Sequence, residues 1–593
     1  MPFPTHARRS LLRYCRLGNG LTALAFLLFA GFVVASNDFD WDHFLSAAEV
    51  DLRSWIIDGA PPLWSYQLCG GVTRAGDPQA FGLSPLILIV LLLGSFWGLK
   101  LGVVLLALLG FWGMNGLLYL FYAQGRPGRS PGPVVLSSVR ALSLAFVLGN
   151  YFLWHFHHGH LTFALDFLAL GLLRILVESF FRPVPRWWLS LAAVLGWTYF
   201  SAGFYHSLIF FLLPLTVGLV LALVAALAVP TIRRTIPPGA LRRLAGTVSA
   251  ALVGLAAGAY KPYLVATFQM AHPRTVESSG GTDGATLLQT ALSHLAPTFD
   301  YLFLGISKGE GTWGIWERSA FSLNSWICLL AVAWLLARRL KRPSSSTGPI
   351  EGAGTPRVLW ILIGTVTAVG LAFTAGDAWP VSAHRVLNAL LDGSVRVAGR
   401  YQIILSVAWA WLAALLIGRS RSLRRGFFRY GVIAVSLLVA LNLLTFRATF
   451  RPASVAEVLR GDLTPIERMQ LVSIVSSRTL NRSFMYGAIM KGQAVLNCYD
   501  PIWRVGVMSR EFKARPELMS ESGKPRVGVH PLIDLHTGRT PESCALESYF
   551  TQSEVHLDDS CPPGTCVNLN AINEANGPLQ FSSAVGKFCL PSP

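Results

Sequence analysis

Residues 21–44 read LTALAFLLFAGFVVASNDFDWDHF, an apolar run that ends in a cluster of acidic and histidine side chains. The run from Leu21 to Ala35 predicts a membrane-spanning helix, and arginines precede it. Because basic residues favour the cytoplasmic side, the acidic cluster is predicted on the extracytoplasmic side. Charges held at a bilayer surface are poorly placed for stability. Asp40 and Asp42 therefore suit a catalytic base or a ligand for a divalent cation.

The composition predicts a polytopic α-helical membrane protein. The chain has 593 residues, is 53% hydrophobic and 13% charged, and long apolar runs recur as far as Leu444. Its net charge of +18 does not indicate nucleic acid, because the basic residues gather in short loops between apolar runs. These loops are 182–186, 233–243, 338–342 and 419–429.

Taking those basic loops as cytoplasmic gives about eleven spans of roughly 17–24 residues each. The predicted spans are 21–36, 101–123, 133–153, 161–179, 187–203, 207–229, 243–266, 320–337, 357–375, 401–417 and 428–446. The N-terminus is then cytoplasmic and the C-terminus extracytoplasmic. The apolar segment from Leu83 to Trp97 is interrupted by Pro85, and we expect it to lie along or dip into the membrane rather than to span it.

This topology divides the chain into a membrane domain, 1–446, and a C-terminal extracytoplasmic domain, 447–593. The membrane domain has two large extracytoplasmic loops, 37–84 and 262–321. The C-terminal part is polar, with short alternating runs such as 504–507 and 526–529. It predicts a small α/β or mostly β soluble domain with its own modest core.

Five of the 8 cysteines lie in the C-terminal domain: Cys498, Cys544, Cys561, Cys566 and Cys589. An extracytoplasmic location favours disulfides, with Cys544–Cys561 the first predicted pair and Cys566–Cys589 the second. A zinc site is the alternative, but no paired histidines accompany these cysteines.

The first loop combines carboxylates with glycines and aromatic residues. Trp64 could stack on a sugar or sit at the membrane interface. We expect Glu49, Asp51 and Asp58 to be solvated loop residues without a chemical role. Lys261, directly before the second loop, and most of the charges within that loop are also expected to be solvated.

The motifs of the first loop resemble those of a family of largely uncharacterised bacterial membrane proteins that is similar to C-type (GT-C) glycosyltransferases. The motifs are Asp-Trp-Asp-His-Phe from Asp40, Pro-Leu-Trp from Pro62, Cys-Gly-Gly from Cys69, Asp-Pro-Gln from Asp77 and Ser-Pro-Leu from Ser84. The resemblance is dense over 37–100, returns at 155–160, 396–401 and 497–501, and is thin elsewhere. It implies a GT-C-like fold, an acidic residue just after the first helix and a polyprenyl-phosphate-linked sugar as donor.

Four histidines lie within 155–160, between two predicted spans. His155 and His160 could bind a metal together with Asp40 or Asp42, or contact a phosphate; hydrogen-bonded structure is the alternative. The metal would be Mg, Mn or Zn, and the reaction does not require one. Asp166, inside the next span, is a functional candidate because ionisable residues are costly there. Arg174 and Glu178 are four residues apart on a helix and could simply pair.

Arg396 and Arg400 lie on the predicted outer side, against the usual distribution of basic residues. They suit the phosphate of a lipid, although headgroup anchoring is the alternative. Lys308 lies among glycines in the second loop and could be a mobile phosphate contact.

Two functions of different classes follow. In the first, a membrane glycosyltransferase moves a sugar from a polyprenyl-phosphate donor to an extracytoplasmic glycan, lipid or protein. Asp40, with Asp42, acts on the acceptor, and Arg396 and Arg400 stabilise the leaving phosphate. In the second, an inactive GT-C-like scaffold binds a lipid or a partner membrane complex. Both place the chain in a bacterial inner membrane, with the C-terminal domain in the periplasm.

Overall fold

The computed structural model describes residues 5–36, 39–65, 72–123, 133–157, 159–203, 205–234, 236–271, 323–340, 357–374, 376, 382–390, 398–449, 552–557, 566–572 and 586–589. The chain forms two compact units. The first comprises 1–34, 100–260 and 276–451, and the second comprises 35–99, 261–275 and 452–593.

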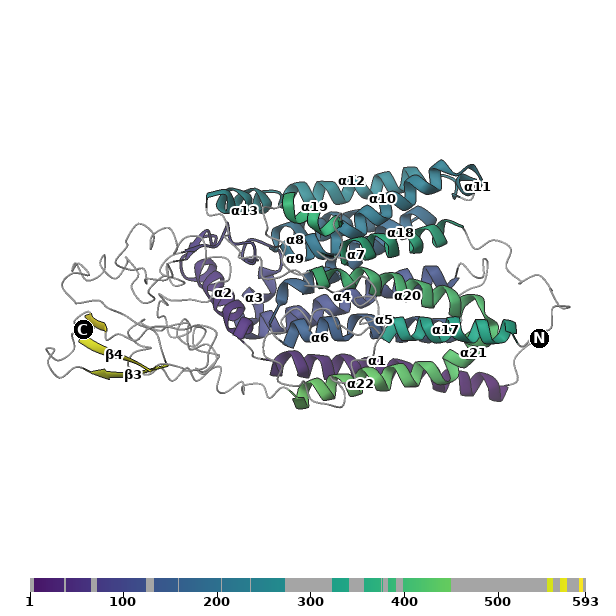
Figure 1. Cartoon of the computed structure of the whole chain (residues 1–593), viewed down its shortest axis with the longest axis horizontal. Helices are drawn as coiled ribbons and strands as arrows, with labels where there is room; N and C mark the ends of the chain where they lie inside the picture. Colours follow the sequence, from purple (N-terminus) through teal and green to yellow (C-terminus); the bar gives the residue numbers. More distant parts are fainter. Residues whose placement is uncertain are drawn as a thin grey trace. The chain divides into compact units, whose positions relative to one another are not determined.

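The first unit is made of helices, most of which run alongside one another (Figure 1). The longer ones are α1 (Thr5–Ala35), α4 (Ser95–Ala123), α5 (Pro133–Val147), α6 (Asn150–His157), α7 (Leu165–Phe181), α8 (Trp187–Ser201), α10 (Leu213–Ala228), α12 (Ala240–Gly258), α17 (Leu323–Leu340), α18 (Arg357–Thr374), α19 (Ala383–Leu390), α20 (Gln402–Arg419) and α22 (Val432–Thr449). Short helical segments lie between them: η1 (Leu161–Ala164), α9 (Tyr205–Ser207), η2 (Leu208–Leu212), α11 (Pro230–Arg233), η4 (Ala398–Tyr401), α21 (Arg421–Gly426) and η5 (Phe427–Gly431).

Six segments of the described chain are long and apolar enough to cross a membrane. They are Ser95–Ala123, Val135–His157, Leu208–Ala228, Ala240–Gly258, Arg357–Thr374 and Gln402–Arg419. Shorter apolar helices cover Asn19–Ala35, Leu323–Ala337 and Val432–Leu444. A multi-pass helical membrane protein is therefore confirmed, whereas the predicted number of spans stays a prediction.

The helices pack closely through small residues and aromatic side chains. Helix α8 contacts α12, α10 contacts α18, and α20 contacts both α17 and α18. A Cβ atom at Gly254 of α12 would lie 1.9 Å from the carbonyl oxygen of Ala193 in α8, so this approach requires glycine. Phe121 of α4 stacks on Trp411 of α20, with ring centroids 4.9 Å apart.

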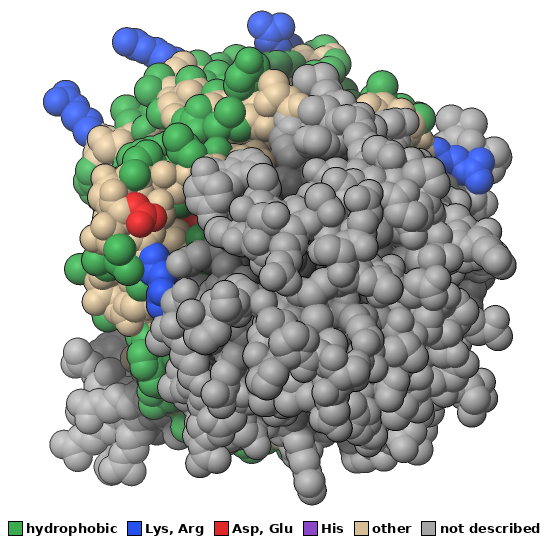
Figure 2. Space-filling view, turned by 90° about the vertical axis from the view of Figure 1, so that its left-hand side faces the viewer, with side chains coloured by type: hydrophobic (Ala, Val, Ile, Leu, Met, Phe, Trp, Pro, Cys, Tyr) green, Lys and Arg blue, Asp and Glu red, His purple; other side chains and the backbone are tan. Residues whose placement is uncertain are grey.

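Large apolar side chains also cover much of the exterior of this unit. Leu27, Leu221 and Leu252 are 71%, 48% and 56% exposed. On the face shown in Figure 2, described hydrophobic side chains lie interspersed with other side chains and backbone. An apolar exterior over helices of this length is what a lipid environment requires.

The second unit contains helix α2 (Phe39–Ile56), strands β1 (Trp64–Ser65) and β2 (Val72–Thr73), and helices α3 (Ile87–Leu93) and α13 (Tyr260–Ala271). Strands β1 and β2 pair antiparallel, with Trp64 opposite Thr73. Its C-terminal part has strands β3 (Gln552–Leu557), β4 (Cys566–Ile572) and β5 (Gly586–Cys589), which form an antiparallel sheet in the order β3-β4-β5.

Two expectations about the first loop are refined. The segment after the first apolar run is helix α2, in which Trp41, Phe44, Leu45 and Ala48 are buried at helical spacing. Helix α3 has 7 residues, ends at Leu93 and is followed by Gly94, whose φ of 78° favours glycine. Seven residues extend about 10 Å, so α3 alone cannot cross a bilayer.

Candidate functional site

The two predicted catalytic acids lie in the first turns of α2. Asp42 is buried, at 6% exposed, whereas the side chain of Asp40 lies outside the described part of the structure. His43 is also buried, and its Nδ1 has no hydrogen-bond partner among the described residues. Trp64 begins β1, but its side chain is likewise outside the described part.

The carboxylates that we expected to be solvated include two that are buried and paired. Asp51 is 0% exposed and accepts hydrogen bonds from Arg74, from Nε at 2.9 Å and from Nη2 at 3.1 Å. Glu49, 7% exposed, accepts from Arg53 at 2.9 Å and from Ser95 at 2.6 Å. Only Asp58 of the three is exposed. The expectation of solvation is therefore wrong for Asp51 and Glu49, because their partners cover them.

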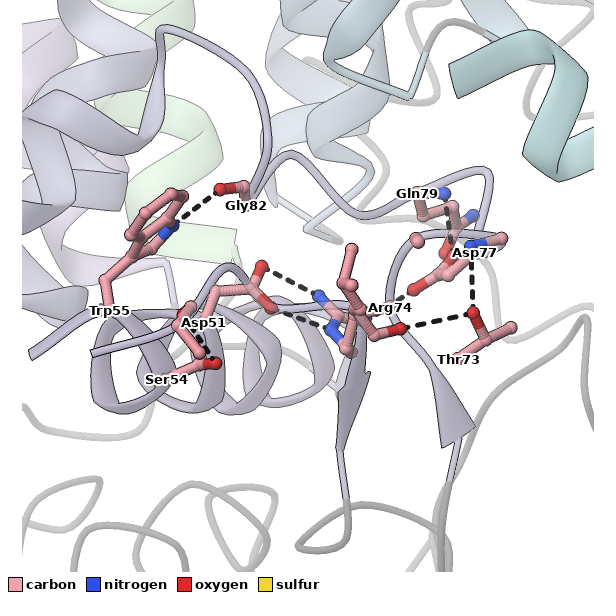
Figure 3. A network of polar contacts seen from close by, with 12 residues as sticks. Asp51, Ser54, Trp55, Thr73, Arg74, Asp77, Gln79 and Gly82 are labelled. Atoms are coloured by element: carbon pink, nitrogen blue, oxygen red, sulfur yellow. Dashed lines mark hydrogen bonds and ion pairs between the residues drawn. The ribbon is translucent and has the colours of Figure 1, made fainter. Parts of the chain in front are cut away.

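Arg74 joins two acids in one buried cluster (Figure 3). Besides Asp51, its Nη1 donates to Oδ2 of Asp77 at 2.5 Å. Lys261, at the start of α13, donates from Nζ to the main-chain oxygens of Arg74 and Ala75 at 3.1 and 3.0 Å. Lys261 is 1% exposed, which corrects the expectation that it is solvated. Burial lowers the pKa of its ammonium group from 10.5 to about 8, and Asp77 opposes that shift.

Three residues predicted from the sequence, His155, His160 and Arg400, meet around one ring in the first unit. His155 stacks on Phe163 with ring centroids 3.6 Å apart, and its Nδ1 lies 2.9 Å from Nδ1 of His160. The guanidinium carbon of Arg400 lies 5.4 Å from the centroid of Phe163 and 5.4 Å from that of Phe210. We call these five residues the Phe163 cluster.

The main chain of Arg400 is fixed by residues next to the cluster. Tyr151 donates a hydrogen bond from its hydroxyl to the carbonyl oxygen of Arg400 at 3.2 Å. Tyr401 is fully buried and packs against Phe210 at 4.9 Å between ring centroids. His155 is buried, whereas the side chains of His160 and Arg400 are only partly covered. These two side chains therefore lie at the edge of a packed aromatic group.

A second polar group lies beside the cluster. His206 Nδ1 is 3.4 Å from Thr162 Oγ1, and its ring centroid is 5.6 Å from that of Phe163. The next residue, Ser207, accepts a hydrogen bond from Tyr199 at 2.9 Å. Asp166, four residues after Thr162, is 1% exposed, and its Oδ1 has no partner among the described residues. Sequence reasoning singled out Asp166 but missed His206.

The Phe163 cluster lies where membrane-spanning segments end. One candidate span ends at His157, another begins at Leu208 just after His206, and a third begins at Gln402 just after Arg400. The span that begins at Leu208 is followed at its other end by Arg233, and the span that begins at Gln402 ends at Arg419. Both arginines belong to loops that are predicted to be cytoplasmic. The cluster is therefore at the opposite ends of these helices.

Two further residues of the predicted site, Arg396 and Lys308, lie outside the described part of the chain. Arg174 pairs with Glu178 at 2.8 Å, which confirms the pairing alternative for them. Among the described residues, no group of three or more His, Cys, Asp or Glu side chains could hold a metal ion. The predicted metal site of Asp40, Asp42, His155 and His160 draws on both units and stays a prediction.

No protein-family model matches the chain, and no curated protein matches it. Among solved structures, the chain is similar to the crystal structure of ArnT from Cupriavidus metallidurans bound to undecaprenyl phosphate. The match has 15% sequence identity, covers 84% of this chain and 88% of that chain, and has a TM-score of 0.36. At this identity and TM-score the similarity assigns neither a family nor an activity to the chain.

Proposed function

We propose that the protein is a membrane glycosyltransferase that moves a sugar from a polyprenyl-phosphate donor to an acceptor hydroxyl on the extracytoplasmic side. The bond between the anomeric carbon and the donor phosphate breaks, and a bond from that carbon to the acceptor oxygen forms. Asp40 takes the acceptor proton, and polyprenyl phosphate leaves with the bonding electrons. Asp42 supports Asp40 from the same turn of α2.

The observation that carries this proposal is the Phe163 cluster. A guanidinium and two imidazoles gather at the ends of candidate membrane spans. A planar guanidinium suits the phosphate of a lipid headgroup at such a level. The buried rings of Phe163 and Phe210 hold the guanidinium of Arg400 in place. A free soluble anion needs no such position, whereas a phosphate carried on a lipid chain does.

The remaining residues keep roles inferred from the sequence. Arg396 and Lys308 add positive charge to the donor phosphate, and Trp64 stacks on a sugar. A divalent metal held by Asp40, Asp42, His155 and His160 would add charge stabilisation for the leaving phosphate. The acceptor is a glycan, a lipid or a protein. The protein then works in a bacterial inner membrane, with the C-terminal domain in the periplasm.

Binding of polyprenyl phosphate tests the donor site directly. We expect the wild-type protein in lipid nanodiscs to bind it, and Arg400→Gln to bind at least about 10-fold more weakly, because a charge-assisted hydrogen bond is lost. Arg419→Gln is the matched control. Arg419 lies at the other end of α20, over the ring of Trp360 at 5.7 Å. Equal affinity for wild type and Arg400→Gln would exclude the cluster as the phosphate site.

The scaffold hypothesis predicts a different result in the same preparation. Polyprenyl phosphate would bind, but no sugar would be transferred from any of a panel of polyprenyl-phosphate sugars. Lipids and glycans extracted from a deletion strain give an independent answer. Accumulation of one lipid-linked sugar favours the enzyme and identifies its donor.

A further inference from the structure

We propose that Arg74 and Lys261 are positioning residues, which through Asp51 and Asp77 fix the first-loop segment 72–82 and the orientation of α2, the helix that bears Asp40. We call the four side chains the Arg74 clamp. The catalytic consequence rests on the proposed function, whereas the structural consequence does not.

Arg74 is the centre of the clamp. Its Nε and Nη2 meet both oxygens of Asp51 in the two-pronged geometry that a planar guanidinium prefers, and its Nη1 meets Asp77. The side chains of Arg74, Asp51 and Asp77 are at most 2% exposed. The forked contact sets the direction of Asp51 as well as its distance, so the loop cannot rotate about α2 while the contact is present.

The segment 72–82 is fixed locally as well. Asp77 uses its second oxygen to accept from the main-chain nitrogen of Gln79 at 2.8 Å, which makes a tight turn. Trp55 of α2 donates from Nε1 to the carbonyl oxygen of Gly82 at 2.9 Å (Figure 3). A Cβ atom at Gly82 would lie 2.5 Å from Oδ2 of Asp51. The segment therefore lies directly on α2 at both of its ends.

Lys261 joins a distant part of the chain to the clamp. Its ammonium group donates to consecutive carbonyl oxygens, those of Arg74 and Ala75, which face it from the loop. Asp77 and Asp51 supply the negative charge and Arg74 the opposing positive charge. The start of α13 thereby adds two hydrogen bonds to the main chain of the loop.

The clamp is better explained by geometry than by stability. Removing charged groups from water is costly, and well-packed apolar residues of similar volume are often equally or more stabilising. Ionic contacts of fixed geometry restrict the segments that they join to one arrangement. This matters where a catalytic side chain must have a defined orientation. Position 51 is eleven residues after position 40, and at about 100° per residue both fall on one face of α2, roughly 16 Å apart. The clamp therefore holds the face to which Asp40 belongs.

Hydrogen–deuterium exchange of the purified protein in nanodiscs tests the structural part without any activity. We expect Arg74→Gln and Lys261→Met to speed exchange about 10-fold or more in both 72–82 and 39–45, because both segments lose their common anchor. Asp58→Asn, which changes an exposed carboxylate of the same region, should leave exchange unchanged. Lys261→Met keeps the volume of the side chain. If Arg74→Gln does not fold, the exchange rates of Lys261→Met alone test the proposal.

Exchange that rises in 72–82 but not in 39–45 would overturn the proposal, since the clamp would then stabilise only its own loop. If the wild type is active, Lys261→Met should lower kcat while the KM for the donor stays within about 2-fold. This is expected because the variant disturbs the orientation of a catalytic group and leaves the donor site intact. A changed KM at constant kcat in Lys261→Met would also contradict the proposed positioning role. If the wild type transfers no sugar, the proposed function fails while the exchange data still judge the clamp.

Discussion

Asp40 stands in the first turn of α2, where free main-chain N–H groups favour a carboxylate whatever its function. Asp40→Asn separates that structural role from catalysis, because asparagine is also accepted at helix N-termini and has nearly the same size. We expect a folded protein whose transfer rate falls about 100- to 10,000-fold, the usual range for loss of a general base. Rates measured with a polyprenyl-phosphate sugar, with Asp58→Asn as the near-silent control, check this. Wild-type turnover in Asp40→Asn would remove Asp40 as the base.

Arg400 tests whether the cluster needs a planar cation or only a positive charge. Arg400→Lys keeps the charge but loses both the forked hydrogen bonding and the flat contact with Phe163 and Phe210. We expect it to weaken donor binding nearly as much as Arg400→Gln. Affinity for polyprenyl phosphate in nanodiscs is the measurement. A lysine variant equal to wild type would indicate simple headgroup anchoring.

Lys261 makes stability depend on pH in a calculable direction. Its pKa is about 8 in the folded protein and near 10.5 when unfolded. Between these values the unfolded chain binds the proton and the folded chain does not, so this group adds stability as pH rises from about 8 to 10.5. We expect the free energy of unfolding to rise more steeply with pH in the wild type than in Lys261→Met across that range, as measured by denaturation. Parallel curves would mean that Lys261 does not titrate there.

Single residues were predictable where the signal was local and were missed where it was not. His155 and His160 are five residues apart, and the structure places their rings in contact. Asp51 pairs with Arg74, 23 residues away, and Lys261 meets the main chain of Arg74 from 187 residues away. No periodicity or motif reports such distant partners. Composition therefore suggested solvation for residues that are among the most buried.

At the scale of elements, apolar length predicted helices better than it predicted their ends. The predicted span 243–266 is interrupted: α12 ends at Gly258 and α13 begins at Tyr260. Helix α2 was missed although its signal was present, since Trp41, Phe44, Leu45 and Ala48 follow the spacing of one helical face. The acidic residues between these positions led us to interpret the segment as a solvated loop.

The strand register favours one of the two predicted disulfides. Cys566 begins β4 and lies directly opposite Cys589, which ends β5. Opposed positions of an antiparallel pair bring Cα atoms to about 4.5–5.5 Å, within the range of a disulfide. Cys544 and Cys561 lie outside the described residues.

We therefore expect the Cys566–Cys589 peptide pair in a non-reduced digest of the protein from its native membrane. The variant Cys566→Ser should destabilise the C-terminal domain by about 2–5 kcal/mol, as loss of a disulfide in a small domain usually does. Cys328, buried in α17, serves as the control thiol that stays reduced. Finding Cys566 and Cys589 as free thiols, or each joined to a different cysteine, would contradict the pairing.

For the whole molecule, the sequence predicted the class of protein and its helical architecture, while the number of spans depends on helices of intermediate length. Helix α7 is buried along much of its length and carries Asp166, Arg174 and Glu178. Arg174 pairs with Glu178 and also donates to the carbonyl oxygen of Trp112 at 2.7 Å. The predicted span 161–179 contains most of this helix, but at 17 residues α7 is at the lower end of the length that crosses a bilayer.

The sidedness of the membrane is the remaining prediction at this scale. The basic loops place the N-terminus and the linker 343–356 in the cytoplasm and the residues after Phe446 outside it. A membrane-impermeant maleimide applied to intact spheroplasts should therefore label Ser553→Cys and leave Ser344→Cys unlabelled. Permeabilisation should expose Ser344→Cys to the same reagent, which shows that the cysteine is accessible from the other side. Labelling of Ser344→Cys before permeabilisation would contradict the predicted topology and would place the Phe163 cluster on the cytoplasmic side.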